Sequence, residues 1–147
     1  MKLQIASRIA IYALLELAAK PDEQVSVAAI GEKYRISSHH LAKVMKVLAR
    51  EGLVRSMRGA GGGSQFSGNA RRVTLLDVIQ LFENVGSQDE SGKPGEATDE
   101  GRALRHILDE INDISRATFG SITIATMLKQ LERHHKDHRR AAAGHAG

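Results

Sequence analysis

The stretch Leu53-Val-Arg-Ser-Met-Arg58, followed at once by Gly59-Ala-Gly-Gly-Gly63, is the most informative part of the sequence. It predicts a short strand, a glycine turn and a second short strand over about 53–68, directly behind a helix pattern rich in Lys and Arg. A tight turn needs positive φ, which glycine adopts without strain, and glycine also lets the backbone come close to phosphates. The stretch therefore predicts a β-wing beside a basic helix.

Three helices are predicted before this wing, at about 3–19, 27–34 and 39–51, because apolar residues recur there at helical spacing. Ser26 is placed to cap the second helix. A serine of the turn Ile36-Ser37-Ser38 is placed to cap the third. Two helices joined by so short a turn are typical of a helix-turn-helix.

The chain after the wing is predicted to form further helices around an irregular segment. Thr74-Leu-Leu-Asp77 has the pattern of a capping box that opens a fourth helix running through Glu83. Residues 84–101 lack periodicity and are rich in Gly, Ser, Asp and Glu, so we expect a flexible loop there. Thr123 is placed to cap a last helix at about 124–137.

A long apolar stripe lies between that loop and the last helix. It predicts a helix that continues to about Thr118 and is broken at Gly120. The stripe consists of five aliphatic residues at helical spacing: Leu104, Ile107, Leu108, Ile111 and Ile114. The predicted fold class is therefore mainly α with a small β-wing, a winged helix-turn-helix followed by a long C-terminal helix.

Charge is distributed unevenly along the chain. Residues 1–72 carry twelve Lys and Arg and five Asp and Glu, a net charge of +7, whereas residues 73–147 carry nine and twelve, a net charge of −3. This asymmetry indicates a basic half that binds a polyanion such as DNA. The sequence has no cysteine, which excludes disulfides and thiolate metal sites. No apolar run approaches the roughly 20 residues that span a bilayer, so we expect a cytoplasmic protein without a membrane partner.

The third predicted helix carries a basic stripe with the spacing i, i+4, i+7 and i+11. A solvated helix face would show the same pattern, but the adjacent wing and the basic half favour binding to double-stranded DNA. Arginines beside the wing suit phosphates or the minor groove. The candidate DNA-binding residues are Arg8, Ser38, His39, His40, Lys43, Lys46, Arg50, Arg55, Arg58, Gly61 and Gly62.

Several of these stretches resemble the winged-helix regulators that include IscR, NsrR and CymR. The resemblance covers about residues 1–130 and rests on the wing and on Arg8-Ile-Ala-Ile-Tyr-Ala-Leu-Leu-Glu-Leu-Ala18, Ser38-His-His-Leu41, Arg58-Gly-Ala-Gly-Gly-Gly63 and Thr74-Leu-Leu-Asp-Val-Ile79. It implies a homodimer in which the apolar stripes pair in antiparallel fashion across a two-fold axis and a pseudo-palindromic DNA site is bound. The chain departs from the family after the glycines, where it has Ser64-Gln65-Phe66 and the family usually has an aromatic residue.

A second departure concerns the cofactor that this resemblance implies. Cluster-binding members of the family use three cysteines, each separated by five residues, and a histidine three positions after the last. Counted without gaps, those positions are Ser91, Ala97, Ala103 and His106. Serine and alanine cannot supply the thiolates that an iron–sulfur cluster needs, so we expect no cofactor. Natural divergence from such sensors and a cysteine-substituted apo form both stay open.

The sequence thus predicts a homodimeric transcriptional regulator, a repressor of bacterial type, rather than an enzyme, since it shows no nucleophile elbow, phosphate loop or paired carboxylates. We expect a DNA-binding domain at 1–83, the flexible loop at 84–101, dimerisation helices at 102–138 and a disordered tail at 139–147.

Three alternatives remain. DNA binding could be controlled by a partner protein or a small ligand held near the loop, or the winged helix could have become a protein-interaction module. His134, His135 and His138 could bind a transition metal, although a solvated basic end is the better interpretation because Arg and Lys surround them.

Overall fold

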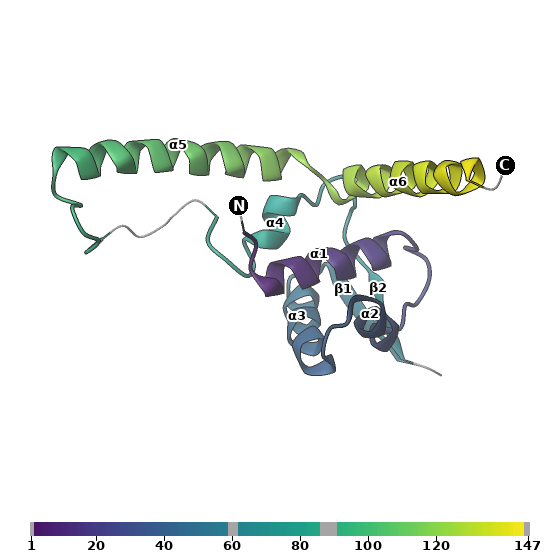
Figure 1. Ribbon diagram of the computed structural model, residues 1–147. Helices are drawn as coiled ribbons and strands as arrows, with labels where there is room; N and C mark the ends of the chain where they lie inside the picture. Colours follow the sequence, from purple (N-terminus) through teal and green to yellow (C-terminus); the bar gives the residue numbers. More distant parts are fainter. Residues whose placement is uncertain (1, 59–61, 86–90, 146–147) are drawn as a thin grey trace.

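The structure is a computed structural model, which describes residues 2–58, 62–85 and 91–145. Six helices and one two-stranded sheet appear in these ranges, in an order that confirms the predicted fold class (Figure 1). The elements are α1 Ile5–Ala18, α2 Val27–Tyr34, α3 Ser38–Arg50, β1 Val54–Met57, β2 Gly63–Phe66, α4 Leu75–Ile79, α5 Asp99–Ser121 and α6 Ile124–Gly144.

Helix α1 is the centre of the core, because α3, β2, α4 and α6 all pack against it. Its side chains are apolar on almost every side, as expected of a helix that is covered all round. The side chains of Leu14 and Leu17 are completely buried, as are those of Leu48 on α3, Ile79 on α4 and Ile124 on α6. In Figure 1, α1 separates α3 below it from α5 and α6, which run end to end along the top.

Side-chain caps fix the starts of the helices where the sequence predicted them. The Ser26 and Ser37 hydroxyls accept hydrogen bonds from the backbone amides of Ala29 and His40, both at 3.2 Å. These contacts begin the two helices of the helix-turn-helix. Thr123 likewise caps α6.

The predicted capping box is present at α4. The Asp77 amide donates to the Thr74 hydroxyl at 3.1 Å, and the Thr74 amide donates to the Asp77 carboxylate at 3.0 Å. Helix α4 is shorter than predicted, since it ends at Ile79 instead of continuing to Glu83. After it, the amides of Leu81 and Phe82 bond to carbonyls three residues back, so the chain tightens into turns.

The wing is an antiparallel hairpin in which Val54 pairs with Phe66 and Met57 with Gly63. A third segment joins its edge, because Val25 and Ser64 exchange both backbone hydrogen bonds at 2.9 Å. A Cβ on Gly63 would lie 2.7 Å from the Val25 carbonyl oxygen, so this glycine is required by the close approach of two backbones.

Two further predicted helix ends are wrong. Helix α5 continues through Gly120 to Ser121, since a glycine inside a helix costs only about 1 kcal/mol relative to alanine. Gly120 lies beside α4, where an added Cβ would be 3.5 Å from Leu76 Cδ2. Helix α6 continues to Gly144, whereas we predicted a disordered tail from residue 139. Its last turns contain Ala141-Ala-Ala143, and alanine has the highest helix propensity of all residues. Neither these helices nor any other in the described ranges is long and apolar enough to cross a bilayer.

Candidate nucleic-acid interface

Helix α3 has one buried apolar face and one exposed basic face. Leu41, Val44, Met45 and Leu48 are buried, whereas the residues on the other side are exposed: Ser38, His39, His40, Lys43, Lys46 and Arg50. The burial of the apolar face against α1 fixes the rotation of the helix, so its basic face necessarily points to solvent. The structure therefore brings six of the predicted residues together on one helix surface.

The start of α3 adds backbone donors to that surface. The Ser37 hydroxyl accepts a hydrogen bond from the His40 amide, and the Ser37 carbonyl accepts one from the Leu41 amide. The amides of Ser38 and His39 belong to the first turn, whose N–H groups have no acceptor inside a helix. Such a turn attracts anions through its N–H groups and its dipole.

The wing supplies a second exposed basic element. Arg55 and Arg58 are both exposed, and Gly62 has a φ of +48°, in the left-handed region that favours glycine. Arg55 Nη2 donates to Gln65 Oε1 at 3.2 Å, and Gln65 Nε2 donates to the Pro21 carbonyl at 2.8 Å. Gln65 thus holds Arg55 on the wing surface. Gly61 lies outside the described residues.

The segment Ser64-Gln65-Phe66, in which the chain departs from the resembling family, belongs to the strand β2 rather than to the wing tip. Ser64 and Phe66 are buried, at 4% and 7% exposure, and only Gln65 turns outward. The unusual residues therefore build the inner face of the wing.

Arg8 lies in a different environment from the α3 residues. Its Nη1 donates to the Tyr12 hydroxyl at 3.3 Å, and the Tyr12 ring stacks on Tyr34 of α2 with centroids 4.7 Å apart. Lys33 and the Tyr34 hydroxyl both donate to the Glu16 carboxylate. Sequence patterns did not predict this cluster, because Tyr12 and Tyr34 meet only once α1 and α2 have packed.

The cluster shifts two pKa values. Burial acts to raise the pKa of Glu16, but the hydrogen bonds from Lys33 and Tyr34 outweigh it and hold that pKa below its ordinary value of 4.5. Burial, together with the hydrogen bond to the Glu16 carboxylate, raises the pKa of Tyr34 above its ordinary value. Tyr34 therefore stays a hydrogen-bond donor and Glu16 stays an acceptor at neutral pH.

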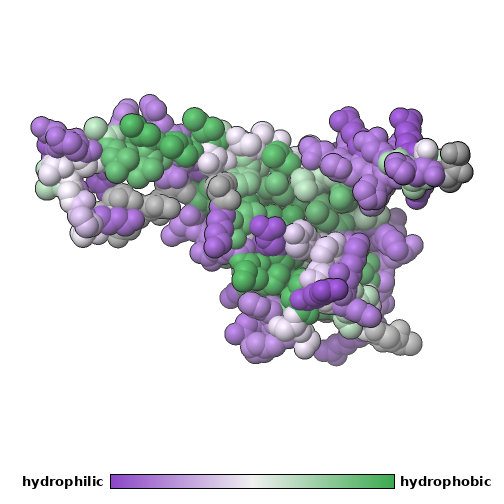
Figure 2. Space-filling view, viewed as in Figure 1, coloured by the Kyte–Doolittle hydropathy of each residue, from purple (hydrophilic) through white to green (hydrophobic). Residues whose placement is uncertain are grey.

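Helix α5 exposes its apolar stripe to solvent. Leu104, Ile107, Ile111 and Ile114 are 56%, 53%, 53% and 67% exposed, while Leu108 is half-buried. Figure 2 shows a green, hydrophobic area along the upper left arm, where Figure 1 places α5, whereas the purple, polar end of α6 lies at the opposite, upper right side. An apolar stripe of this length is typical of a surface that is covered by another protein chain.

The four positions that the family resemblance implies as cluster ligands lie at the beginning of α5 and before it. Ser91, Ala97, Ala103 and His106 are all exposed, and His106 Nε2 lies 3.5 Å from the Glu110 carboxylate. Their donors are one hydroxyl and one imidazole, which do not fit an iron–sulfur cluster. Within the described ranges, no group of three His, Cys, Asp or Glu side chains could hold a metal ion, the three histidines of α6 included.

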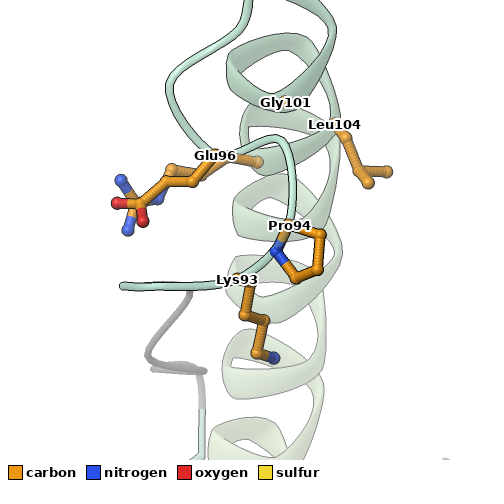
Figure 3. A pocket seen from close by; sticks show the side chains of 6 residues that line it. Lys93, Pro94, Glu96, Gly101 and Leu104 are labelled. Carbon is orange, nitrogen blue, oxygen red and sulfur yellow. The ribbon is translucent and has the colours of Figure 1, made fainter.

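The described end of the loop, residues 91–98, folds back onto the first turn of α5. The Thr98 hydroxyl donates to the Gly95 carbonyl at 2.6 Å and accepts from the Gly101 amide at 3.0 Å. A Cβ on Gly101 would lie 2.0 Å from the Gly95 oxygen, so the two backbones touch directly. The cavity beside them, shown in Figure 3 between Lys93, Pro94 and Leu104, has a volume of about 40 Å³. That volume holds about one water molecule.

A helix-turn-helix whose second helix is basic on its exposed side, followed by a wing with exposed arginines, defines the class of winged-helix DNA-binding proteins. Residues 3–130 match the model of the Rrf2 family, which is described as an iron-dependent transcriptional regulator. The chain belongs to this family and is a DNA-binding transcriptional regulator.

Individual relatives agree with this assignment. The chain is 46% identical over 132 residues to the helix-turn-helix regulator BadM of Rhodopseudomonas palustris, covering 90% of this chain and 84% of BadM. The structure of CymR, the global cysteine regulator of B. subtilis, superimposes with a TM-score of 0.75 at 25% identity and covers 88% of this chain and 98% of CymR. IscR of T. potens gives a TM-score of 0.73 at 26% identity, with 91% and 90% covered.

Proposed function

We propose that the protein is a homodimeric repressor that binds a pseudo-palindromic operator without an iron–sulfur cluster. The observation that carries the proposal is the exposed face of α3, where Lys43, Lys46 and Arg50 stand on a helix fixed by a buried apolar face. In this proposal α3 enters the major groove and its first turn binds a phosphate. The wing arginines Arg55 and Arg58 bind the flanking backbone or minor groove.

The exposed stripe of α5 supports the homodimer. A two-fold axis at the middle of the stripe, between Ile107 and Ile111, buries the same four aliphatic residues of both copies in an antiparallel helix pair. Each dimer then presents two α3 helices, which is why we expect a pseudo-palindrome. A protein that acts on chromosomal DNA in this way works in the cytoplasm.

We infer the absence of a cluster from the donor atoms that the chain offers. The chain has no cysteine anywhere, and the positions that match the ligands of relatives hold Ser91, Ala97 and Ala103 with His106. A repressor without a cluster needs another means of regulating its DNA binding. A second candidate, regulation by a partner protein or a small ligand, is favoured by the ordered turn at residues 91–98, which packs on α5.

The salt dependence of binding tests the proposal. We would titrate chelator-treated protein against a labelled duplex that carries its operator and measure fluorescence anisotropy between 50 and 200 mM salt. If the dimer neutralises roughly 6–10 phosphates, affinity should fall about 10³–10⁵-fold over that range. Binding that appears only after reconstitution with iron and sulfide would contradict a cluster-free repressor.

A further inference from the structure

Helix α5 is attached to the DNA-binding domain at its C-terminal end. The Leu75 amide donates to the Ile122 carbonyl at 2.8 Å, and the Ile124 amide donates to the Val73 carbonyl at 2.9 Å. These two bonds pair the start of α4 with the connection between α5 and α6. No residue of α5 is fully buried, and the helix packs on α4 and the core near its C-terminal end, through Phe119 and Gly120, so its direction is set at this end.

A second attachment lies on α5 itself, at Arg116. Its Nη1 donates to the Val85 carbonyl at 2.6 Å. The amide of Gln80, oriented with its oxygen toward Arg116, accepts from Nη1 at 3.1 Å and from Nη2 at 3.2 Å. Six residues separate Arg116 from Ile122, about 9 Å along a helix. Two attachments at that separation fix the angle between α5 and the DNA-binding domain, whereas the attachment at Ile122 alone fixes it less firmly.

The segment that Arg116 holds is itself tied to the core. Glu83 Oε2 accepts from the Ser7 hydroxyl at 2.5 Å and from the Gln4 amide at 2.9 Å, at the beginning of α1. Ser7 is fully buried, at 0% exposure. Because α3 packs on α1, a continuous series of hydrogen bonds and packed helices runs from the dimerisation helix to the basic face.

We propose that Arg116, Gln80 and Glu83 form a polar brace that sets the angle between α5 and the DNA-binding domain and thereby selects the spacing between the two operator half-sites. The inference rests on the proposed homodimer. Ile107 lies 15 residues from Ile122, about 22 Å along the helix, so a pivot of about 10° displaces the dimer axis by about 4 Å. One base pair changes the half-site separation by about 3.4 Å and rotates one half-site by about 35°.

The test compares Arg116→Gln with Arg102→Gln on duplexes in which the distance between half-sites is shortened or lengthened by one or two base pairs. Arg102 is a matched control, because it also lies on α5 and donates to a backbone carbonyl, that of Ala97 at 2.7 Å, but at the opposite end of the helix. Wild type and Arg102→Gln should bind the preferred spacing about tenfold better than its neighbours, the size of a typical operator defect. For Arg116→Gln this preference should fall below about threefold, with unchanged affinity for a single half-site.

Ser7→Ala, which removes a donor to Glu83, provides a second variant if Arg116→Gln does not fold. Like Arg116→Gln, it should reduce the preference for one half-site spacing over its neighbours. A wild-type spacing preference in both folded variants would overturn the brace, as would an equal loss in Arg102→Gln. If wild type bound no duplex at any spacing, the proposed operator binding would fail first and the brace with it.

Discussion

The exposed faces of α3 and α5 differ in the chemistry they leave in water. Helix α3 buries its apolar side against α1 and exposes Lys43, Lys46 and Arg50, whereas α5 exposes Ile107 and Ile111. Cations in water are well solvated, so the α3 face is stable without a partner. Apolar side chains in water are not, so the α5 face is suited to burial against another chain. Under the proposed function, the α3 face needs no further protein partner, whereas a second copy of the chain would cover the α5 face.

Charge placed in the α5 stripe should have the largest effect. Replacing both Ile107 and Ile111 by Glu would bury four carboxylates at the dimer axis, at a cost far above that of any surface substitution. We expect monomers in analytical ultracentrifugation and a loss of operator affinity of about 10³-fold or more, since a single half-site loses the second set of contacts. Leu108→Ala, on the half-buried edge of the same stripe, should retain more of the dimer. A dimer that survives the double substitution would refute the role of the stripe.

The next effect concerns the α3 face. Lys43→Ala with Lys46→Ala removes two cations per protomer, four per dimer, without touching the buried side of the helix. If both lysines contact phosphates, the slope of log affinity against log salt should decrease by about 0.9 for each, or about 3.6 for the dimer. Lys129→Ala on α6 is the control and should leave the slope unchanged. If the double variant keeps the wild-type affinity and slope, α3 does not dock on DNA as proposed.

Gly63→Ala tests the packing of the wing, and its expected effect is smaller than those of the substitutions on α5 and α3. Its Cβ would stand 2.7 Å from the Val25 carbonyl oxygen, so the backbone of one segment must move. We expect thermal unfolding to show a loss of about 1–3 kcal/mol, as for an overpacked core site. Gly144→Ala is the matched control, because nothing lies within 4 Å of its added Cβ and alanine favours a helix. Equal stability of the two variants would mean that the Val25 contact does not constrain the wing.

The smallest effect is expected at the cluster around Glu16. Its pKa is lower in the folded protein than the ordinary 4.5, so its stabilisation is present above about pH 4.5 and is lost as pH falls through the folded value. Lys33 is largely exposed, which limits the contribution to about 1 kcal/mol or less. Urea unfolding of Glu16→Gln should therefore differ from wild type at pH 7, and the difference should shrink as pH falls through the lowered pKa of Glu16. A difference that stays constant as the pH is lowered would assign the effect to something other than ionisation.

Sequence reasoning succeeded where short-range contacts decide the structure. Ser26, Thr74 and Thr123 cap their helices through bonds to residues three positions away, so a local pattern was sufficient. The alternation of buried and basic residues on α3 was equally visible, because helical periodicity alone determines which residues share a face.

Prediction failed where contacts distant in sequence decide the structure. Gly120 lies inside a helix and beside α4, and the stacking of Tyr12 on Tyr34 depends on two helices meeting. The hydrogen bonds from Ser7 to Glu83 and from Arg116 to Val85 join residues 76 and 31 positions apart. No periodic pattern reports such pairs, so the polar brace could be found only in three dimensions.

The most direct test of the central claim is capture of fragmented genomic DNA by chelator-treated protein at about 150 mM salt, followed by sequencing, with the Lys43→Ala, Lys46→Ala variant in parallel. We expect wild type to enrich a pseudo-palindrome upstream of a small number of genes and the variant to lose this enrichment. Uniform weak capture by wild type, or the same sites recovered by both proteins, would contradict it.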